Sequence, residues 1–326
     1  MMNLQNFMTK MNVSPPLEEA ILALANAMVE TGEALTKAPI NKQLGKLDQE
    51  NVQGETQSEL DVISNDIFMK NLEDTHAVIG VVSEEIEKEI IFDKPRRDCQ
   101  LLVFFDPLDG SSNIDPNITV GSIFSIYELK HDDPVAPEDF LQTGRDQVAA
   151  GFSVYGSSMT LILTVGNGTF KFCYDQSSKF FSCTEENIKI SPDANEFAIN
   201  MSNQRFWSKP IQKYVEDCLL GETDVRKKDF NMRWIGSMVA DLSRVLTRGG
   251  IYLYPKDNKK PERAGRLRLM YEINPMALII EQSKGSCTDG VNRILDIKSD
   301  NIHQRAPVVA GSKNEVDLVK HYYQDI

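Results

Sequence analysis

The stretch LLVFFDPLDGSSN, residues 101–113, is the strongest constraint on the fold of this chain. Its apolar start is typical of a strand that is buried on both faces, as in α/β proteins. Two acids follow, Asp106 and Asp109, with Pro107 between them. Pro107 fixes its own φ and predicts a turn that brings both carboxylates toward one point. We therefore expect acids at the sheet edge where α/β proteins bind ligands.

The residues around these acids have the properties of a combined cation and anion site. The carbonyl of Leu108 lies between the acids, and Gly110 lets the backbone approach a ligand closely. The next residues, Ser111, Ser112 and Asn113, predict a helix start whose free N–H groups attract phosphate. Taken alone, the stretch also fits an ordinary strand–turn–helix connection capped by Asp and Ser.

Further acids stand near the ends of predicted elements. They are Asp61 in a helix over 57–72, Glu84 and Glu85 in a strand over 78–85, and Glu272 in LMYEINP. Carboxylates suit Mg²⁺ or Mn²⁺, and the four dispersed histidines form no competing cluster. Each acid alone is typical of a solvated element end, whereas the combination indicates a cation site. An EF-hand loop is excluded, because its closing glutamate position, counted from Asp106, is Asn117.

The remaining pattern predicts an α/β protein (α+β by some schemes) with mixed sheets. Helical spacing covers 17–37, 208–219 and 235–248, and the strands SIFSIYEL, VAAGFSVYG, MTLILTVG and IYLYP are bounded by turn residues. The polar segment 41–59 predicts a mobile loop. The sequence changes character near residue 190, which predicts two domains, 1–190 and 191–326.

Charge and cysteine content exclude several classes of partner. The net charge of −13 disfavours nucleic acid and anionic membranes, so an anionic substrate requires metal ions or a local basic patch. We find no apolar run long enough to span a membrane and no secretory or transit signal. The five scattered cysteines lack a C-x-x-C pair, which argues against a disulfide framework and predicts a cytoplasmic protein.

Several motifs resemble class I fructose-1,6-bisphosphatase, a family of the lithium-sensitive sugar phosphatase superfamily. They are NVQGE and LDVISND (within 51–66), VVSEE (81–85), FDPLDGSSNID (105–115), GSMVADLSR (236–244), YEINPMA (271–277) and HQRAPVVAGS (303–312). The DPLDGSS run is shared with inositol monophosphatases, whereas the C-terminal motifs are more specific. The resemblance implies a layered αβαβα sugar-phosphatase fold with two subdomains and a homotetrameric assembly.

The resemblance also implies a metal-dependent hydrolytic site. Glu84, Asp106, Asp109, Glu272 and the Leu108 carbonyl match ligands of about two or three Mg²⁺ ions, with Mn²⁺ as an alternative. Asp61 and Glu85 match residues that orient and deprotonate the attacking water, and Glu55 stands at the position of a loop aspartate with a related role. The expected reaction converts D-fructose 1,6-bisphosphate to fructose 6-phosphate and phosphate in gluconeogenesis.

Substrate contacts match positions in both halves of the chain. They are Asp109, Gly110, Ser111, Ser112, Asn200, Met238, Tyr254 and Arg266, together with Arg233, which matches an arginine that reaches a neighbouring subunit's site. Trp234 replaces a usual tyrosine and Arg266 a usual lysine, although a forked guanidinium still suits phosphate. Outside the motifs, Arg233 and Arg266 are typical of solvated surface charges.

Two regulatory features of related enzymes are missing from the sequence. SPPLEEAIL (14–22) stands where animal members carry the start of an AMP site. Gln100 and Leu101 replace its lysine–tyrosine pair, and Glu128 replaces an arginine. The cysteine-bearing insertion of chloroplast members is also missing. We expect neither AMP inhibition at that site nor thioredoxin-type control.

Three other functions stay open on the sequence alone. Sedoheptulose-1,7-bisphosphatase activity, alone or in addition, involves the same reacting phosphate. An inositol or nucleotide phosphatase would share the DPLDGSS run but lack the C-terminal motifs. A non-catalytic sugar-phosphate sensor would keep the pocket, although its retention of every carboxylate argues for catalysis.

Overall fold

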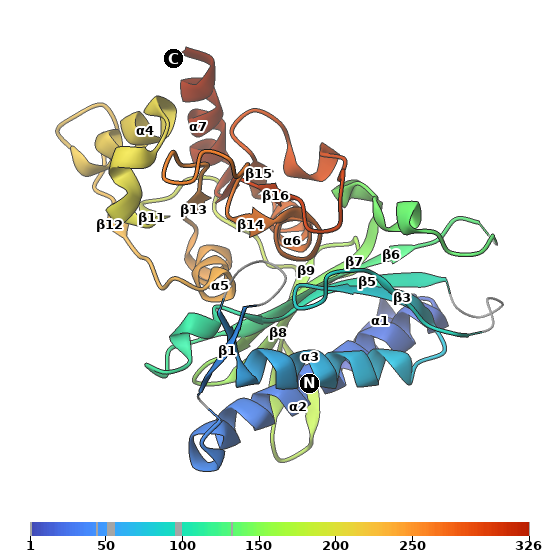
Figure 1. Ribbon diagram of the computed structural model, residues 1–326. Helices are drawn as coiled ribbons and strands as arrows, with labels where there is room; N and C mark the ends of the chain where they lie inside the picture. Colours follow the sequence, from blue (N-terminus) through green and yellow to red (C-terminus); the bar gives the residue numbers. More distant parts are fainter. Residues whose placement is uncertain (1, 44, 51–55, 95–99, 132, 326) are drawn as a thin grey trace.

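The computed structural model describes residues 2–43, 45–50, 56–94, 100–131 and 133–325 of the chain. Helices and mixed sheets alternate in five layers, which confirms the predicted αβαβα arrangement (Figure 1). The helices are α1 (Leu4–Lys10), α2 (Pro15–Asn41), α3 (Glu59–Glu73), α4 (Lys209–Leu219), α5 (Met238–Arg248), α6 (Asn274–Gln282) and α7 (Lys313–Asp325). Helices α1–α3 cover the outer face of the larger sheet, α5 and α6 lie between the sheets, and α4 and α7 cover the smaller sheet.

The larger sheet has eight strands in the order β10-β9-β8-β7-β6-β5-β3-β4. Their bounds are β3 (Val78–Ser83), β4 (Ile90–Ile91), β5 (Leu101–Asp109), β6 (Gly121–Glu128), β7 (Gln147–Tyr155), β8 (Met159–Thr164), β9 (Thr169–Asp175) and β10 (Phe180–Glu185). The pair β3 and β5 is parallel, with Ser83 opposite Phe105, and the other neighbouring pairs are antiparallel. The chain therefore leaves β3 beside Asp106.

The smaller sheet has the strand order β12-β11-β13-β17-β15. Its strands are β11 (Glu196–Ala198), β12 (Asn231–Met232), β13 (Ile251–Tyr254), β15 (Ser286–Thr288) and β17 (Val308–Gly311). Strand β11 runs parallel to both β12 and β13, so these three strands end at one edge. The predicted boundary at residue 190 stays a prediction, and the two sheets lie on either side of it.

Two short strand pairs complete the described structure. Strand β1 (Lys46–Glu50) pairs with β2 (Thr56–Ser58), and β14 (Leu267–Arg268) pairs with β16 (Arg305–Ala306). The first pair lies inside the segment predicted to be a loop, so that prediction is wrong for the strand residues. Its polar composition hid the strands, because backbone pairing does not require apolar side chains.

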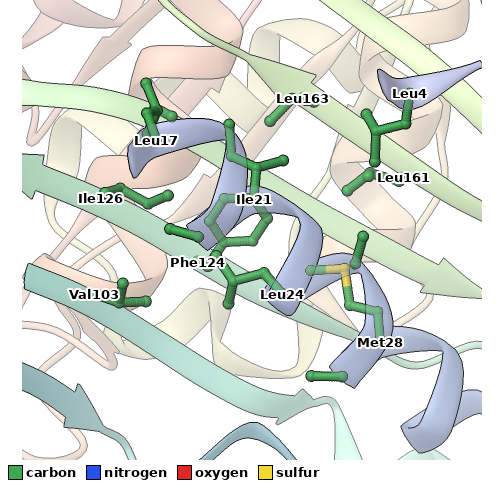
Figure 2. Packing of buried hydrophobic residues seen from close by; sticks show 14 of the residues in the cluster. Leu4, Leu17, Ile21, Leu24, Met28, Val103, Phe124, Ile126, Leu161 and Leu163 are labelled. Carbon is green, nitrogen blue, oxygen red and sulfur yellow. The ribbon is translucent and has the colours of Figure 1, made fainter. Parts of the chain in front are cut away.

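Helix α2 packs along the larger sheet through one apolar face (Figure 2). Leu17, Ile21, Leu24 and Met28 recur at helical spacing and lie against strand residues such as Phe124. Each fully buried aliphatic side chain of this kind contributes about 1.5–3 kcal/mol relative to an exposed one. The helix predicted over 17–37 is confirmed, and it extends two residues earlier because proline is well suited to a first helical turn.

Side chains along β13 alternate between the two faces of the smaller sheet, and one face packs toward the larger sheet. Tyr252 faces the middle layer with residues of α5 and α6, whereas Ile251 and Leu253 face α4 and α7. Phe152 of the larger sheet belongs to the same middle cluster as Tyr252. Helices α5 and α6 therefore bury apolar side chains against both sheets. Asp109 of the larger sheet contacts the start of α5.

Candidate active site

Three buried carboxylates converge where β5, α5 and the turn before α6 meet. Oxygen atoms of Asp106, Asp109 and Glu272 all lie within 4.8 Å of one another. Asp106 and Glu272 are each 2% exposed, and Asp109 is 8% exposed. The prediction that these sequence-distant acids converge is confirmed. Glu272 lies in the π-helical turn Leu269–Ile273, not on a surface helix.

Asp106 and Asp109 share a side of the sheet because the strand is irregular between them. In a regular strand, residues three positions apart point to opposite faces. Here the register of β5 against β6 shifts between the two acids, and the Leu108 N–H donates to the Asp106 carboxylate at 2.9 Å. The strand continues through Pro107, so the predicted end of the strand there is wrong. A bulge tolerates proline because a residue there need not donate to the ladder.

Asp109 docks the larger sheet onto the start of α5. Its Oδ2 accepts hydrogen bonds from the Ser237 hydroxyl at 2.9 Å and the Val239 N–H at 3.1 Å. Gly110 follows at φ 79°, and a Cβ there would lie 2.7 Å from Ser237 Cβ. The glycine therefore permits both the left-handed backbone and the close approach of Ser237.

The chain after Gly110 makes only a short turn. Ser111–Asn113 form one 3₁₀ turn, closed by hydrogen bonds from Asn113 N–H to the Gly110 carbonyl and from Ile114 N–H to the Ser111 carbonyl. The predicted helix start is therefore wrong. Asn117 adopts a left-handed backbone, with φ 57°, in the connection between this turn and β6. Ser111 nevertheless lies close enough to Asp61 to lower the pKa of that carboxyl, which places this turn beside the acids.

Glu84 lies beside the cluster, paired with a buried arginine. Its N–H donates to the Phe105 carbonyl at 3.1 Å, and its Oε1 lies 2.8 Å from Arg268 Nη1. The same Nη1 is 3.8 Å from Glu272 Oε2, and the Arg268 N–H donates to that oxygen at 2.5 Å. Sequence reasoning missed Arg268, because its alternation with leucines just before Glu272 does not distinguish a buried arginine from an exposed one.

Burial and mutual repulsion disfavour the ionised form of the carboxylates in this cluster when no metal is bound. Burial raises the pKa of Asp106 well above its usual range, and the charges of Glu84, Asp109 and Glu272 raise it further. Burial likewise raises the pKa of Asp109 to about 6 and that of Glu272 well above its ordinary value. A divalent cation would relieve this repulsion, and hard oxygen donors suit Mg²⁺ or Mn²⁺. The donor set therefore fits a metal site.

The two acids predicted to handle the attacking water lie at neighbouring element ends. Asp61 accepts a hydrogen bond from the Ser58 N–H at 2.7 Å and closes a capping box at the start of α3, a role that sequence reasoning missed. Burial raises the Asp61 pKa, and the charge of Glu84 adds to this. Glu85 is half-buried, and its N–H donates to the Ser83 hydroxyl at 3.2 Å. Glu55 lies outside the described residues.

Two predicted substrate contacts share the edge where β11 and β13 end. Ala198 is opposite Tyr252 in the parallel register, so Asn200 and Tyr254, each two positions further, lie at the same edge. Trp234 stacks on Tyr252 with ring centroids 5.9 Å apart and meets Tyr254 edge-on at 5.9 Å. Trp234 therefore supports this edge through its ring.

The other predicted substrate residues have different surroundings. Met238 is the buried first residue of α5, directly after Ser237. Arg266 Nη2 pairs with Asp257 Oδ2 at 3.0 Å, an ion pair that the sequence did not indicate. Arg233 is exposed, and its Nη1 donates to the Met232 carbonyl at 3.0 Å.

Fold and site together define an α/β protein with a buried, oxygen-only site for hard cations. Comparison with known proteins specifies the family. The chain matches the family model described as "Fructose-1-6-bisphosphatase, N-terminal domain" over residues 4–186 and the corresponding C-terminal domain model over residues 190–324. This protein belongs to the fructose-1,6-bisphosphatase family, which confirms the resemblance inferred from its motifs.

Curated relatives and solved structures agree with this assignment. The class 1 fructose-1,6-bisphosphatase of Acinetobacter baylyi is 49% identical over 312 residues, 96% of this chain and 95% of the relative. That of Acinetobacter baumannii strain SDF is 50% identical over 314 residues, 96% of each chain. The holo crystal structure of Leishmania major fructose-1,6-bisphosphatase superposes with a TM-score of 0.93 at 35% identity, covering 99% of this chain and 98% of that one.

Proposed function

We propose that this protein is a Mg²⁺-dependent fructose-1,6-bisphosphatase that hydrolyses the 1-phosphate of D-fructose 1,6-bisphosphate in gluconeogenesis. The observation that carries the proposal is the buried cluster of Asp106, Asp109 and Glu272, with oxygens within 4.8 Å. The supporting comparison is the 49% identity to a class 1 enzyme over nearly the whole chain.

Glu84, the Leu108 carbonyl and the three clustered acids would hold about two or three ions, Mg²⁺ or alternatively Mn²⁺. Such ions, when bound, polarise the phosphate, acidify a water and stabilise the leaving oxygen. The contacts from Ser237 and Val239 fix the orientation of the Asp109 carboxylate before any ligand arrives. This preorganisation limits the reorganisation needed during reaction.

Asp61 and Glu85 would orient and deprotonate the attacking water, assisted by Glu55. Burial is the main cause of the raised pKa of Asp61, and it makes this carboxylate a stronger base than a solvated aspartate. Gly110, Ser111 and Ser112 would hold the reacting phosphate beside these acids. Most of the rate enhancement would come from positioning and charge stabilisation.

Asn200, Met238, Tyr254 and Arg266 would bind the sugar and its 6-phosphate at the edge of the smaller sheet. The exposed Arg233 would complete a neighbouring subunit's phosphate site within a homotetramer. A cytoplasmic location forms part of this proposal, and the described cysteines are all free thiols, as in a reducing compartment. Among the described residues, no helix is long and apolar enough to cross a membrane.

A phosphate-release assay with purified protein tests the proposal. It compares fructose 1,6-bisphosphate, sedoheptulose 1,7-bisphosphate and inositol 1-phosphate, each with Mg²⁺ and with EDTA. We expect Mg²⁺-dependent release from fructose 1,6-bisphosphate, with fructose 6-phosphate as the second product. Exclusive turnover of either other substrate would reassign the enzyme, and no turnover of any would favour a sugar-phosphate sensor.

A further inference from the structure

We propose that His303 is a positioning residue that holds the segment carrying Glu84 and Glu85 in register with the turn carrying Glu272. The inference rests on the proposed metal-dependent function and deepens it. Each segment supplies a carboxylate to the candidate cation site. Their spacing therefore affects cation affinity.

The imidazole of His303 lies between the two segments. Its Nδ1 is 2.8 Å from the hydroxyl oxygen of Tyr271, the residue immediately before Glu272. Its Nε2 is 3.1 Å from the backbone carbonyl oxygen of Glu87, two positions after Glu85. One side chain thus contacts both segments through hydrogen bonds.

The partners determine where the imidazole proton lies. A carbonyl only accepts, so Nε2 carries the proton and donates to Glu87. Nδ1 then accepts from the hydroxyl of Tyr271, which is fully buried. Burial lowers the His303 pKa and raises that of Tyr271 well above its usual range, so both groups are neutral at physiological pH. The bridge therefore adds no charge to the acid cluster.

The segment that carries His303 is anchored firmly on the Glu272 side. The Leu269 N–H, at the start of the Glu272 turn, donates to the Gln304 carbonyl at 2.7 Å. Ile302 packs against the buried cluster that contains Met270 and Tyr271. Because this side is anchored, the hydrogen bond from His303 to the Glu87 carbonyl can hold the segment that carries Glu84 and Glu85 in place.

The segment after β3, which carries Glu84 and Glu85, is partly exposed and is also held in place by the His303 hydrogen bond. Glu87 is exposed, and Ile86 is only half-buried. Upstream, the segment is held by the bonds from Glu84 N–H to Phe105 and from Glu85 N–H to Ser83. The His303 bond supports its downstream side. Groups that orient metal-binding segments in this way commonly alter cation affinity when removed.

Calorimetric titration of Mg²⁺ into the full-length protein without substrate tests this inference. His303→Phe keeps a ring but removes both hydrogen bonds, and we expect the Kd for Mg²⁺ to rise on the order of tenfold. Tyr271→Phe removes one hydroxyl and should give a smaller rise. His303→Gln offers a donor at a similar reach and should recover part of the affinity. The half-saturating Mg²⁺ concentration for catalysis should rise in parallel, with kcat at saturating Mg²⁺ near the wild-type value.

His131→Phe is the matched control, because its Nε2 lies 2.8 Å from Asp139 in a loop outside the site. An unchanged Kd in His303→Phe would overturn the inference, and so would an equal rise in the control. If His303→Phe does not fold, thermal unfolding will reveal it, and Tyr271→Phe and His303→Gln then decide by the same criterion. The titration needs no substrate, so a wild type that binds Mg²⁺ without hydrolysing sugar phosphates would refute only the proposed activity.

Discussion

Asp109 has two roles: it is one of the clustered acids of the candidate site, and it joins the larger sheet to α5. Its carboxylate belongs to the acid cluster, while its Oδ2 accepts two hydrogen bonds from the start of α5. Charge serves the first role and hydrogen-bond acceptance serves the second. A substitution that removes the charge but keeps an oxygen acceptor therefore separates the two roles.

Asp109→Asn should lower kcat/KM for fructose 1,6-bisphosphate by about two orders of magnitude or more, because it removes a charged cation ligand. The asparagine oxygen still accepts from Ser237 and Val239, so the variant should keep the fold and unfold cooperatively on heating. Steady-state phosphate release and thermal unfolding measure the two effects. Asp66→Asn, an exposed site on α3, is the control and should retain full activity. Wild-type rates in Asp109→Asn would show that the ligand assignment is wrong.

The same variant should be more stable than the wild type at neutral pH without metal. Burial raises the pKa of Asp109 from 3.8 to about 6. Between these values the folded wild type binds more protons at this residue than the unfolded chain, so its stability falls as pH rises through that window. The stability advantage of Asp109→Asn should therefore grow with pH, by at most about 1.4 kcal/mol per unit.

Urea denaturation in EDTA at several pH values between 4 and 7 measures this difference. Saturating Mg²⁺ at pH 7 should reverse the order of stability, because the wild type alone retains the full set of carboxylates. If the difference in free energy of unfolding between variant and wild type stays constant with pH, the pKa of Asp109 is not raised by folding.

Sequence reasoning found the acids of the cluster but not the buried arginine, Arg268, that pairs with them. Asp106 and Asp109 stand out because two acids after a buried strand are unusual, and Glu84 and Glu272 lie within recognisable motifs. Arg268 alternates with leucines, a pattern that is equally typical of an exposed edge strand. Its burial depends on β14 pairing with β16 and on Glu84, which tertiary structure alone reveals.

At the scale of elements, long periodic segments were predictable and local irregularities were not. Helix α2 follows from an apolar repeat that continues over many turns. The rule that proline ends a strand failed at Pro107, because pairing with β6 resumes beyond the bulge. The turn that contains Glu272 is π-helical, a rare geometry with no simple sequence pattern.

Gly110→Ala tests how closely β5 must approach α5. The added Cβ would meet Ser237 Cβ at 2.7 Å in a left-handed backbone, so we expect destabilisation of about 2 kcal/mol or more and a large loss of activity. Gly166→Ala is a matched control, with φ 89° and open space around its Cβ. It should cost only about 1 kcal/mol and leave activity unchanged. Equal effects of the two substitutions on activity would remove the argument from close approach.

The start of α2 leads to a prediction about regulation. Ser14 and Pro15 open this helix, Leu101 is buried, and Glu128 is an exposed acid at the end of β6. These residues offer none of the basic side chains that a nucleotide phosphate requires. AMP titrated into the activity assay should therefore leave the rate unchanged at concentrations that inhibit an animal enzyme assayed in parallel. Inhibition in the micromolar range would contradict this prediction.

At the scale of the whole molecule, the layers were predictable in kind, but the meeting of distant segments was not. Alternation of facing residues along β13 is consistent with helices on both faces of its sheet. No local pattern relates Asp106 to Glu272, because the two residues meet only through the packing of the Leu269–Ile273 turn against β5 and β6. Their convergence was expected only from the family resemblance together with the physics of cation sites.

Arg233 connects the single chain to its proposed assembly. Its backbone is fixed by the bond from its N–H to the Phe197 carbonyl, yet its side chain is exposed. An arginine held at the surface in this way suits a phosphate site that is completed by a neighbouring subunit. If each site takes Asp109 from one subunit and Arg233 from another, two different defects can be complemented in a mixed oligomer.

Co-refolding of Arg233→Ala with Asp109→Asn tests this arrangement. Each variant alone should have low activity at subsaturating fructose 1,6-bisphosphate. In an equimolar mixture, half of the subunit pairs are hybrids, and one of the two sites in each hybrid has neither defect. For an isologous interface, activity should therefore recover to roughly one quarter of the wild-type value. A mixture no more active than the mean of its components, despite subunit exchange shown by differential tagging, would place Arg233 outside the neighbouring site.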